Sequence, residues 1–463
     1  MKKQILFFLL FFTAAAFAQD VTGNWYGLVK FPGGQLRLTL HVNKAQDSYT
    51  ATLDSPDQGA EGIPVSKIAF TDNTLTFTIP AIKAEYKGTY ADNIITGTFT
   101  QNNFPMPLNL GREEVKTEAP KRPQEPVKPY PYHSEDVTFT NAKQGIILSG
   151  TLTLPQQKGN FPAVVLISGS GPQDRNEELL GHKPFLVIAD YLTRNGIAVL
   201  RYDDRGTGAS GGKFAGATTE DFAADAAAAL AYLQSRPEIN KKKTGLIGHS
   251  EGGIIAPIVA NTNKDTGFIV LLAGTAIPGD ELMLLQNYLI NKAAGMPEAE
   301  LTKLGGINRK IYDAIKQETD INVLKAKLDE IFNKELKPLF ISKGIPESQV
   351  AQYIDMQVAE LTSAWYINFI RYNPAPALEK VQCPILAING SNDLQVAPVA
   401  NLEAIKRAAA KSGNKDVTVK ELPGLNHLFQ QSTTGLPAEY GEIEQTIAPA
   451  ALNEILQWIK KRV

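Results

Sequence analysis

The chain is poor in cysteine and has no dense Lys/Arg tract. Cys383 is the only cysteine among 463 residues, so an internal disulfide is excluded and folding must depend on a hydrophobic core. The formal net charge is −2 and no Lys/Arg tract is dense enough to attract a polyanion. We therefore expect neither nucleic acid nor an anionic membrane as a partner. Cys383 lies in the apolar segment 381–390, where we expect a buried strand residue rather than a reactive thiol.

The chain also lacks an apolar run of the roughly 20 residues that a membrane-spanning helix needs. At the start of the chain, two lysines precede a shorter apolar run, and Ala16-Phe17-Ala18 completes the segment. This pattern is typical of a secretory signal peptide over residues 1–18, cleaved after Ala18, and a membrane anchor is the alternative. We therefore expect an exported protein, periplasmic or secreted, with no membrane insertion once the signal is removed.

The length predicts two or three domains rather than one. Residues 19–114 alternate apolar and polar side chains with a period of two, and turn pairs such as Asp72-Asn73 separate the runs, so we expect a small all-β domain built as a meander or barrel. Trp25 is expected to fill its core. Residues 115–134 hold five prolines, which favour extended polyproline geometry and predict a linker.

From residue 135 to residue 463, apolar strands alternate with helical stretches. Strands of this kind are expected in a parallel sheet that helices cover on both faces. The strand pattern stops at about 280–375, where the residues follow a helical pattern, and it returns afterwards. We predict an α/β domain with a mostly parallel central sheet and a helical cap inserted at about 280–375.

A serine between glycines stands where a predicted strand becomes a predicted helix. Gly248-His249-Ser250-Glu251-Gly252 fits the pattern G-x-S-x-G, whose tight turn needs small residues at Gly248 and Gly252. A tight turn alone would explain the glycines. A hydroxyl placed there, however, projects above the sheet at a helix N-terminus, which predicts that Ser250 is a catalytic nucleophile.

A serine nucleophile needs a base, and in this strand-turn-helix arrangement the acid and the histidine follow the serine along the chain. Of the five histidines, only His427 lies after Ser250 with a predicted strand before it, so elimination selects it as the base. Asp393 directly follows another predicted strand and is expected to orient His427. Rival acids lie before strands, in helices or inside strands: Glu379, Glu403, Asp416 and Glu421.

The oxyanion hole is predicted from backbone N–H groups. One belongs to Glu251, the residue after the nucleophile, and the other to the glycine-rich loop "SGSGPQDRN", with Ser170 the first choice and Gly171 the second. A dinucleotide-binding loop is the alternative for this segment, but Asp174 replaces the last glycine of that motif. The segment "DDRGTGASGGKF" departs from a phosphate loop because Phe214 stands where serine or threonine would bind magnesium.

Five segments together resemble the α/β-hydrolase superfamily, in its bacterial secreted carboxylesterase-like or serine aminopeptidase-type branch. They are "LISGSGPQDRN", "LRYDDRGTGAS", "LIGHSEGG", "NGSNDLQV" and "LPGLNHLFQ". The resemblance covers about 135–463 and implies an α/β-hydrolase fold with a helical cap, acyl transfer from Ser250, and esters with short acyl chains. Ser168 departs from the bulkier or charged start of the oxyanion loop that is more typical of the branch.

These observations predict a serine hydrolase that acts on a small-molecule ester without a metal or cofactor. Near the end of the cap, Trp365, Tyr366 and Phe369 either line its substrate pocket or only pack. A peptidase with the same triad is the main alternative and would need an amine-binding acid in the cap, with Glu298, Glu300 and Asp355 unranked. A non-catalytic binding protein is the second alternative, and the residues give no indication of oligomeric state.

Overall fold

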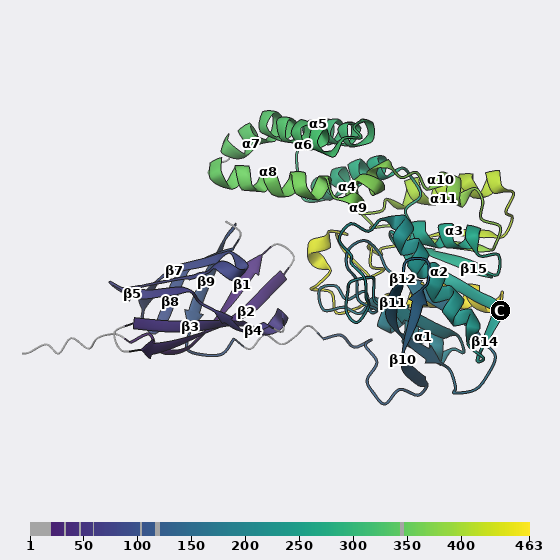
Figure 1. Ribbon diagram of the computed structural model, residues 1–463, viewed down its shortest axis with the longest axis horizontal. Coiled ribbons are helices and arrows are strands. Elements are labelled where there is room, and N and C mark those ends of the chain that lie inside the picture. Colours follow the sequence, from purple (N-terminus) through teal and green to yellow (C-terminus); the bar gives the residue numbers. More distant parts are fainter. Residues whose placement is uncertain are drawn as a thin grey trace, which may run out of the picture. The chain divides into compact units, whose positions relative to one another are not determined.

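A computed structural model describes residues 20–31, 34–45, 48–58, 60–101, 104–115, 121–342 and 347–463. The chain divides into two compact units, Met1–Glu118 and Ala119–Val463 (Figure 1). The predicted signal peptide, residues 1–18, lies outside the described residues. Among the helices of the described part, none is long and apolar enough to cross a membrane.

The first unit is an antiparallel sheet of nine strands, as the alternating pattern predicts. Its order, β4-β3-β2-β1-β9-β8-β7-β6-β5, is that of a meander whose two halves meet at the β1–β9 pair. Trp25 is fully buried in its core, which confirms the expected role of that residue. The strands are β1 (Gly23–Phe31), β2 (Gly34–Ala45), β3 (Ser48–Ser55), β4 (Ala60–Pro64), β5 (Lys67–Thr71), β6 (Thr74–Ile79), β7 (Ala84–Ala91), β8 (Ile94–Gln101) and β9 (Phe104–Gly111).

The second unit is built on an eight-stranded sheet in the order β10-β11-β13-β12-β14-β15-β16-β17. The first two strands pair antiparallel, and β11 also runs antiparallel to β13, whereas all pairs from β13 to β17 are parallel. The strands are β10 (His133–Asn141), β11 (Ile146–Leu154), β12 (Phe161–Ile167), β13 (Ala198–Tyr202), β14 (Ile239–His249), β15 (Phe268–Leu272), β16 (Ile385–Gly390) and β17 (Val417–Leu422).

Helices cover both faces of this sheet. The central strand β12 is apolar at successive positions because both of its faces are buried. Ala163, Val165 and Ile167 belong to the core beneath α2, α3 and α11. Val164 and Leu166 point to the opposite face and belong to the core beneath α1 and α12. The helices are α1 (Pro184–Arg194), α2 (Thr219–Ser235), α3 (Gly252–Thr262), α11 (Pro398–Ser412) and α12 (Pro449–Lys460).

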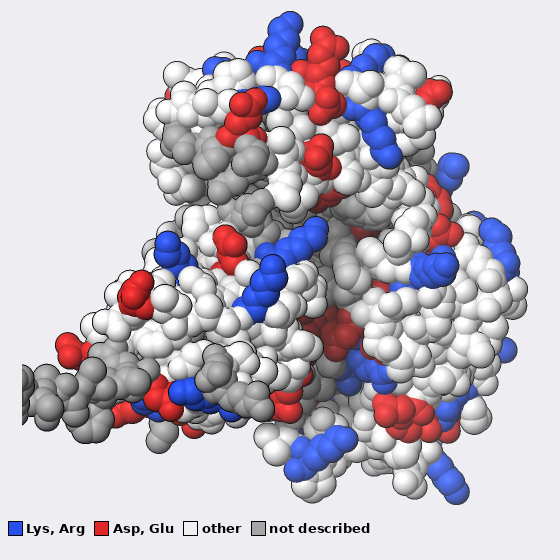
Figure 2. All heavy atoms as spheres, turned by 60° about the vertical axis from the view of Figure 1, so that its left-hand side comes forward, with Lys and Arg blue, Asp and Glu red and all other residues white. Residues whose placement is uncertain are grey.

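The predicted cap is a group of helices inserted between β15 and β16 (green in Figure 1). It has a hydrophobic core of its own, to which Ile311, Leu328 and Ile354 contribute from three different helices. Basic and acidic side chains are interspersed over the face that Figure 2 shows. The helices of this region are α4 (Gly279–Ala293), α5 (Glu298–Gln317), α6 (Ile321–Ile331), α7 (Lys337–Ser342), α8 (Glu347–Leu361) and α9 (Ala364–Arg371), and the short α10 (Ala375–Leu378) leads back to the sheet.

Two local expectations need refinement. The proline-rich segment 115–134 is bound to the second unit over residues 121–125, because the Arg122 guanidinium donates hydrogen bonds to four backbone carbonyls there, those of Leu180, Gly181, Gly441 and Ile443.

Cys383 is only half-buried and precedes β16 rather than lying in it, since Pro384 follows it directly. Burial nevertheless raises the pKa of its thiol to about 11, which disfavours the reactive thiolate.

Candidate active site

Ser250 stands at a sharp turn between β14, which ends at His249, and α3, which begins at Gly252. Its φ of +52° is in the left-handed region, which costs a non-glycine residue about 1–3 kcal/mol. The flanking glycines permit this turn: a Cβ at Gly248 would lie 2.0 Å from the carbonyl oxygen of Gly252, and one at Gly252 would lie 2.3 Å from that of Ile167. The glycine positions predicted for the elbow are therefore required by close backbone approach.

Asp393 and His427 follow β16 and β17, two adjacent parallel strands, so both lie at the carboxyl edge of the sheet. Oδ2 of Asp393 is 2.8 Å from Nδ1 of His427, and Oδ1 accepts hydrogen bonds of 2.8 Å from the backbone N–H groups of Gln395 and Val396. Because a carboxylate only accepts, Nδ1 of His427 carries the proton. The structure brings together the acid and histidine that chain order selects, and Nε2 is left for another partner.

The loop after β12 is held by two buried carboxylates. Asp204 accepts hydrogen bonds from the Ser168 hydroxyl (2.9 Å) and from the N–H of Gln173 (3.1 Å), and Glu177 accepts the N–H of Gly169 at 2.7 Å. Burial raises the pKa of Asp204 to about 8. Within the described residues, the N–H groups of Ser170 and Glu251 have no acceptor. These are the two backbone donors that the sequence places first for an oxyanion hole.

The polar side chain of Glu251 is buried beside the elbow, with 2% of its surface exposed. Its carboxylate accepts hydrogen bonds from the Thr219 hydroxyl at 2.7 Å and from the Trp365 indole N–H at 3.0 Å. Burial raises the pKa of Glu251, although these hydrogen bonds oppose the shift. The residue after the serine therefore links the elbow to α9 of the cap.

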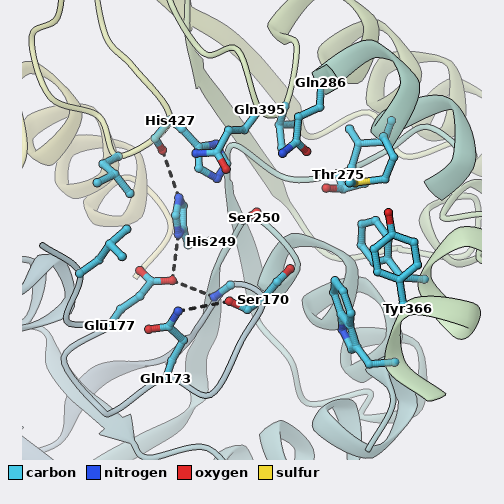
Figure 3. Close-up of a pocket in the computed structure, with 18 of the residues that line it drawn as sticks. Ser170, Gln173, Glu177, His249, Ser250, Thr275, Gln286, Tyr366, Gln395 and His427 are labelled. Atoms are coloured by element: carbon cyan, nitrogen blue, oxygen red, sulfur yellow. Dashed lines mark hydrogen bonds and ion pairs between the residues drawn. The ribbon is translucent and has the colours of Figure 1, made fainter. Parts of the chain in front are cut away.

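A cavity of about 280 Å³ opens onto Ser250 between the sheet edge and the cap (Figure 3). His427 and Ser170 line it from the sheet side, whereas Gly171 does not. The predicted aromatic residues of the cap line it as well, Trp365 stacking on Phe369 with ring centroids 5.1 Å apart. The lining residues from the cap are Leu282, Met283, Gln286, Glu360, Trp365, Tyr366 and Phe369.

Sequence reasoning missed two acidic residues of this cavity. Glu177 lies eight residues after Gly169 in the loop that follows β12, and Glu360 lies near the end of α8. The cap acids considered from the sequence, Glu298, Glu300 and Asp355, are not among the lining residues. The acidic run at 177–178 directly after the glycine-rich loop is the one signal that could have drawn attention to Glu177.

Several known proteins are similar to this chain. Residues 183–431, more than half of the chain, match the family model described as serine aminopeptidase, S33. Esterase EstD of Thermotoga maritima is 26% identical over 339 residues, which are 72% of this chain and 69% of that protein. The solved Pyrococcus furiosus esterase Pf2001 is 16% identical with a TM-score of 0.43, covering 75% of this chain and 99% of its own. The solved structure of the hypothetical protein PA2218 of Pseudomonas aeruginosa is 17% identical with a TM-score of 0.41, and the match covers 76% of this chain and 99% of that protein.

The second unit thus has the α/β-hydrolase fold with a helical cap, and an all-β domain precedes it. The protein is an enzyme of the serine hydrolase class. The chain belongs to the S33 serine aminopeptidase family of α/β hydrolases.

Proposed function

We propose that this enzyme hydrolyses carboxylic esters with short acyl chains through an acyl-enzyme on Ser250. The observation that carries the proposal is a cavity lined by Ser250, on its strained turn, and by His427, whose Nδ1 is hydrogen-bonded to Asp393. Beside Ser250, the N–H groups of Ser170 and Glu251 have no acceptor among the described residues. This is the set of groups that acyl transfer requires. The modest volume of about 280 Å³, lined on the cap side by the apolar residues Leu282, Met283 and Phe369, supports a small acyl group.

The proposed reaction proceeds in two balanced halves. Nε2 of His427 takes the proton of the Ser250 hydroxyl as Oγ attacks the ester carbonyl carbon, and the N–H groups of Glu251 and Ser170 stabilise the oxyanion. Collapse of this tetrahedral intermediate breaks the bond to the alcohol, which leaves with the proton from His427. Water then attacks the acyl-enzyme by the same route, releasing the carboxylic acid and restoring Ser250.

A second candidate function, hydrolysis of aminoacyl amides, is favoured by one observation. Glu360 places a carboxylate at the edge of the cavity, where it could bind a free α-ammonium group. A charge-assisted hydrogen bond of that kind is worth about 1.5–3 kcal/mol, or roughly 10–150-fold in kcat/KM. The esterase proposal requires no such preference.

A substrate panel separates the two candidates. We expect kcat/KM to be highest for p-nitrophenyl acetate to butyrate and to fall by about tenfold or more for octanoate, because extra methylenes do not fit. Aminoacyl anilides and their N-acetylated counterparts form the second arm of the panel. Efficient anilide hydrolysis that depends on the free amine, and that Glu360→Gln abolishes, would replace the esterase proposal with the peptidase one.

We further propose that the enzyme works after export, in the periplasm or outside the cell. Residues 1–18 have the composition of a signal peptide, which supports export. Because the chain has a single cysteine, folding outside the cytoplasm requires no internal disulfide. The intact mass of the protein recovered from the exported fraction is expected to correspond to a chain that begins at Gln19. A mass that includes residues 1–18 would contradict the proposal.

A further inference from the structure

Behind the nucleophile lies a buried acid–histidine pair that the triad does not use. Glu177 and His249 have exposed fractions of 5% and 7%, and both line the cavity. Figure 3 shows the His249 ring between Glu177 and His427, with hydrogen bonds on both sides. The ring centroids of His249 and His427 are 4.8 Å apart. The pair is therefore in direct contact with the proposed catalytic histidine.

The contacts of this pair form a continuous chain. Oε1 of Glu177 accepts the backbone N–H of Gly169 at 2.7 Å and lies 2.9 Å from Nδ1 of His249. Nε2 of His249 lies 3.1 Å from the backbone carbonyl oxygen of His427. Three segments far apart in sequence are thereby joined: the loop that offers Ser170, the elbow that carries Ser250 and the loop that carries His427.

The geometry also fixes the charge of the ring. A carboxylate on one side and a backbone carbonyl on the other can only accept hydrogen bonds, so both nitrogens of His249 must carry protons. Burial disfavours this imidazolium ion, but the Glu177 carboxylate, the His427 carbonyl and the charge of Asp393 together offset that penalty and raise the pKa of His249 above 6.5. Asp393 and His427 are further ionisable groups near the ring, and the buried carboxyl of Asp204 interacts electrostatically with Glu177 from the other side of the oxyanion loop.

We propose that Glu177 and His249 are a positioning pair, an ion pair that sets the distance between the oxyanion loop and the His427 loop. The inference rests on the proposed function. A buried ion pair contributes little net stability but breaks at high cost, which suits a role in fixing geometry. Because misplacement of a catalytic group by about 1 Å can lower the rate about 100-fold, such a positioning pair affects kcat more than KM.

The pair also makes the site sensitive to alkaline pH. Since the pKa of His249 is raised in the folded protein, the ion pair is complete at lower pH and is lost as the pH rises through that pKa. We therefore expect kcat to fall on the alkaline side in the wild-type enzyme.

The test uses the full chain with Glu177→Gln, His249→Asn and the double variant. Each single variant is expected to lower kcat by about 10–100-fold with KM changed by less than about threefold. The kcat of the double variant should be no lower than that of the slower single variant, because both changes remove the same ion pair. The alkaline fall in kcat should disappear in His249→Asn and in the double variant, which have no ring to titrate. In Glu177→Gln it should move to lower pH, because the neutral amide no longer raises the pKa of His249.

His182→Gln is the matched control for loss of a buried histidine. His182 is fully buried but bonds to the Thr446 hydroxyl and the Tyr440 carbonyl, and burial lowers its pKa to about 4, so it carries no charge. Its replacement is expected to lower Tm without altering the alkaline limb. If Glu177→Gln and His249→Asn behave like this control, with kcat and pH profile unchanged, the positioning role is wrong.

Two measurements on the wild-type enzyme keep the test independent of variant folding. Nitrogen-15 shifts of the His249 ring should report both nitrogens protonated at neutral pH, and a neutral ring would overturn the inference. Labelling by a fluorophosphonate probe should modify Ser250. Failure of that labelling would instead overturn the proposed function, so the two failures can be told apart.

Discussion

Replacing Ser250 by alanine is expected to lower kcat for ester hydrolysis by about a million-fold, to the level that the oxyanion donors and binding alone sustain. The reason is that alanine removes the oxygen on which the proposed acyl-enzyme forms, while the Cβ at the strained position and the two flanking glycines are unchanged. Single-turnover and steady-state rates with p-nitrophenyl acetate measure the effect. Because KM depends little on the hydroxyl, the loss should lie in kcat.

Ser235→Ala is the matched control for this substitution. Ser235 ends α2 on the surface and donates only to the carbonyl of Tyr232, so its loss should leave kcat and KM at wild-type values. Mass spectrometry of the acylated or phosphonylated enzyme should place the adduct on the peptide that contains Ser250. Activity of Ser250→Ala within about 100-fold of the wild type would rule out the nucleophile assignment.

The parts of the site that chain order and strand ends determine were predictable from sequence. Only one histidine follows Ser250, and Asp393 directly follows an apolar run, so both are assigned to the carboxyl edge of a parallel sheet without any knowledge of distances. The structure places their side chains 2.8 Å apart. The two glycines of the elbow were predictable for the same reason, since the turn geometry itself demands them.

The parts that depend on long-range side-chain contacts were not predictable. Glu177 contacts His249 across 72 positions in the chain, and no periodicity or motif encodes that contact. The sequence also gives no ranking of the acidic residues in the cap, because which helix face meets the cavity depends on how α4, α8 and α9 pack together. Glu360 is therefore found only when the cap is folded over the sheet.

His249 stands beside the serine in the G-x-S-x-G pattern, and the structure shows what its side chain contacts. A residue at the end of β14 points to one side of the strand, and here that side holds both Glu177 and the carbonyl of His427. Adjacent residues of the elbow thus have different roles in the proposal: Ser250 lines the cavity as the nucleophile, and His249 contacts the loops that carry Glu177 and His427.

Asparagine at position 393 is expected to lower kcat by about 10,000-fold while the protein remains folded. Oδ1 of Asp393 is fixed by the N–H groups of Gln395 and Val396, so the carbonyl oxygen of an asparagine must take that place. Its NH₂ group then faces Nδ1 of His427, which has to become an acceptor, and the ring proton moves to Nε2. A ring with Nε2 protonated cannot take the proton of Ser250.

Asp416→Asn provides the control for Asp393→Asn, because Asp416 also lies close to a strand of the same sheet but pairs on the surface with Arg462. An exposed pair contributes at most about 1 kcal/mol to stability, so this variant should keep wild-type kcat. The decisive comparison is the proton location on His427, read by NMR: on Nδ1 in the wild type and on Nε2 in Asp393→Asn. A small loss of kcat in Asp393→Asn, or an unchanged tautomer, would mean that another group orients His427.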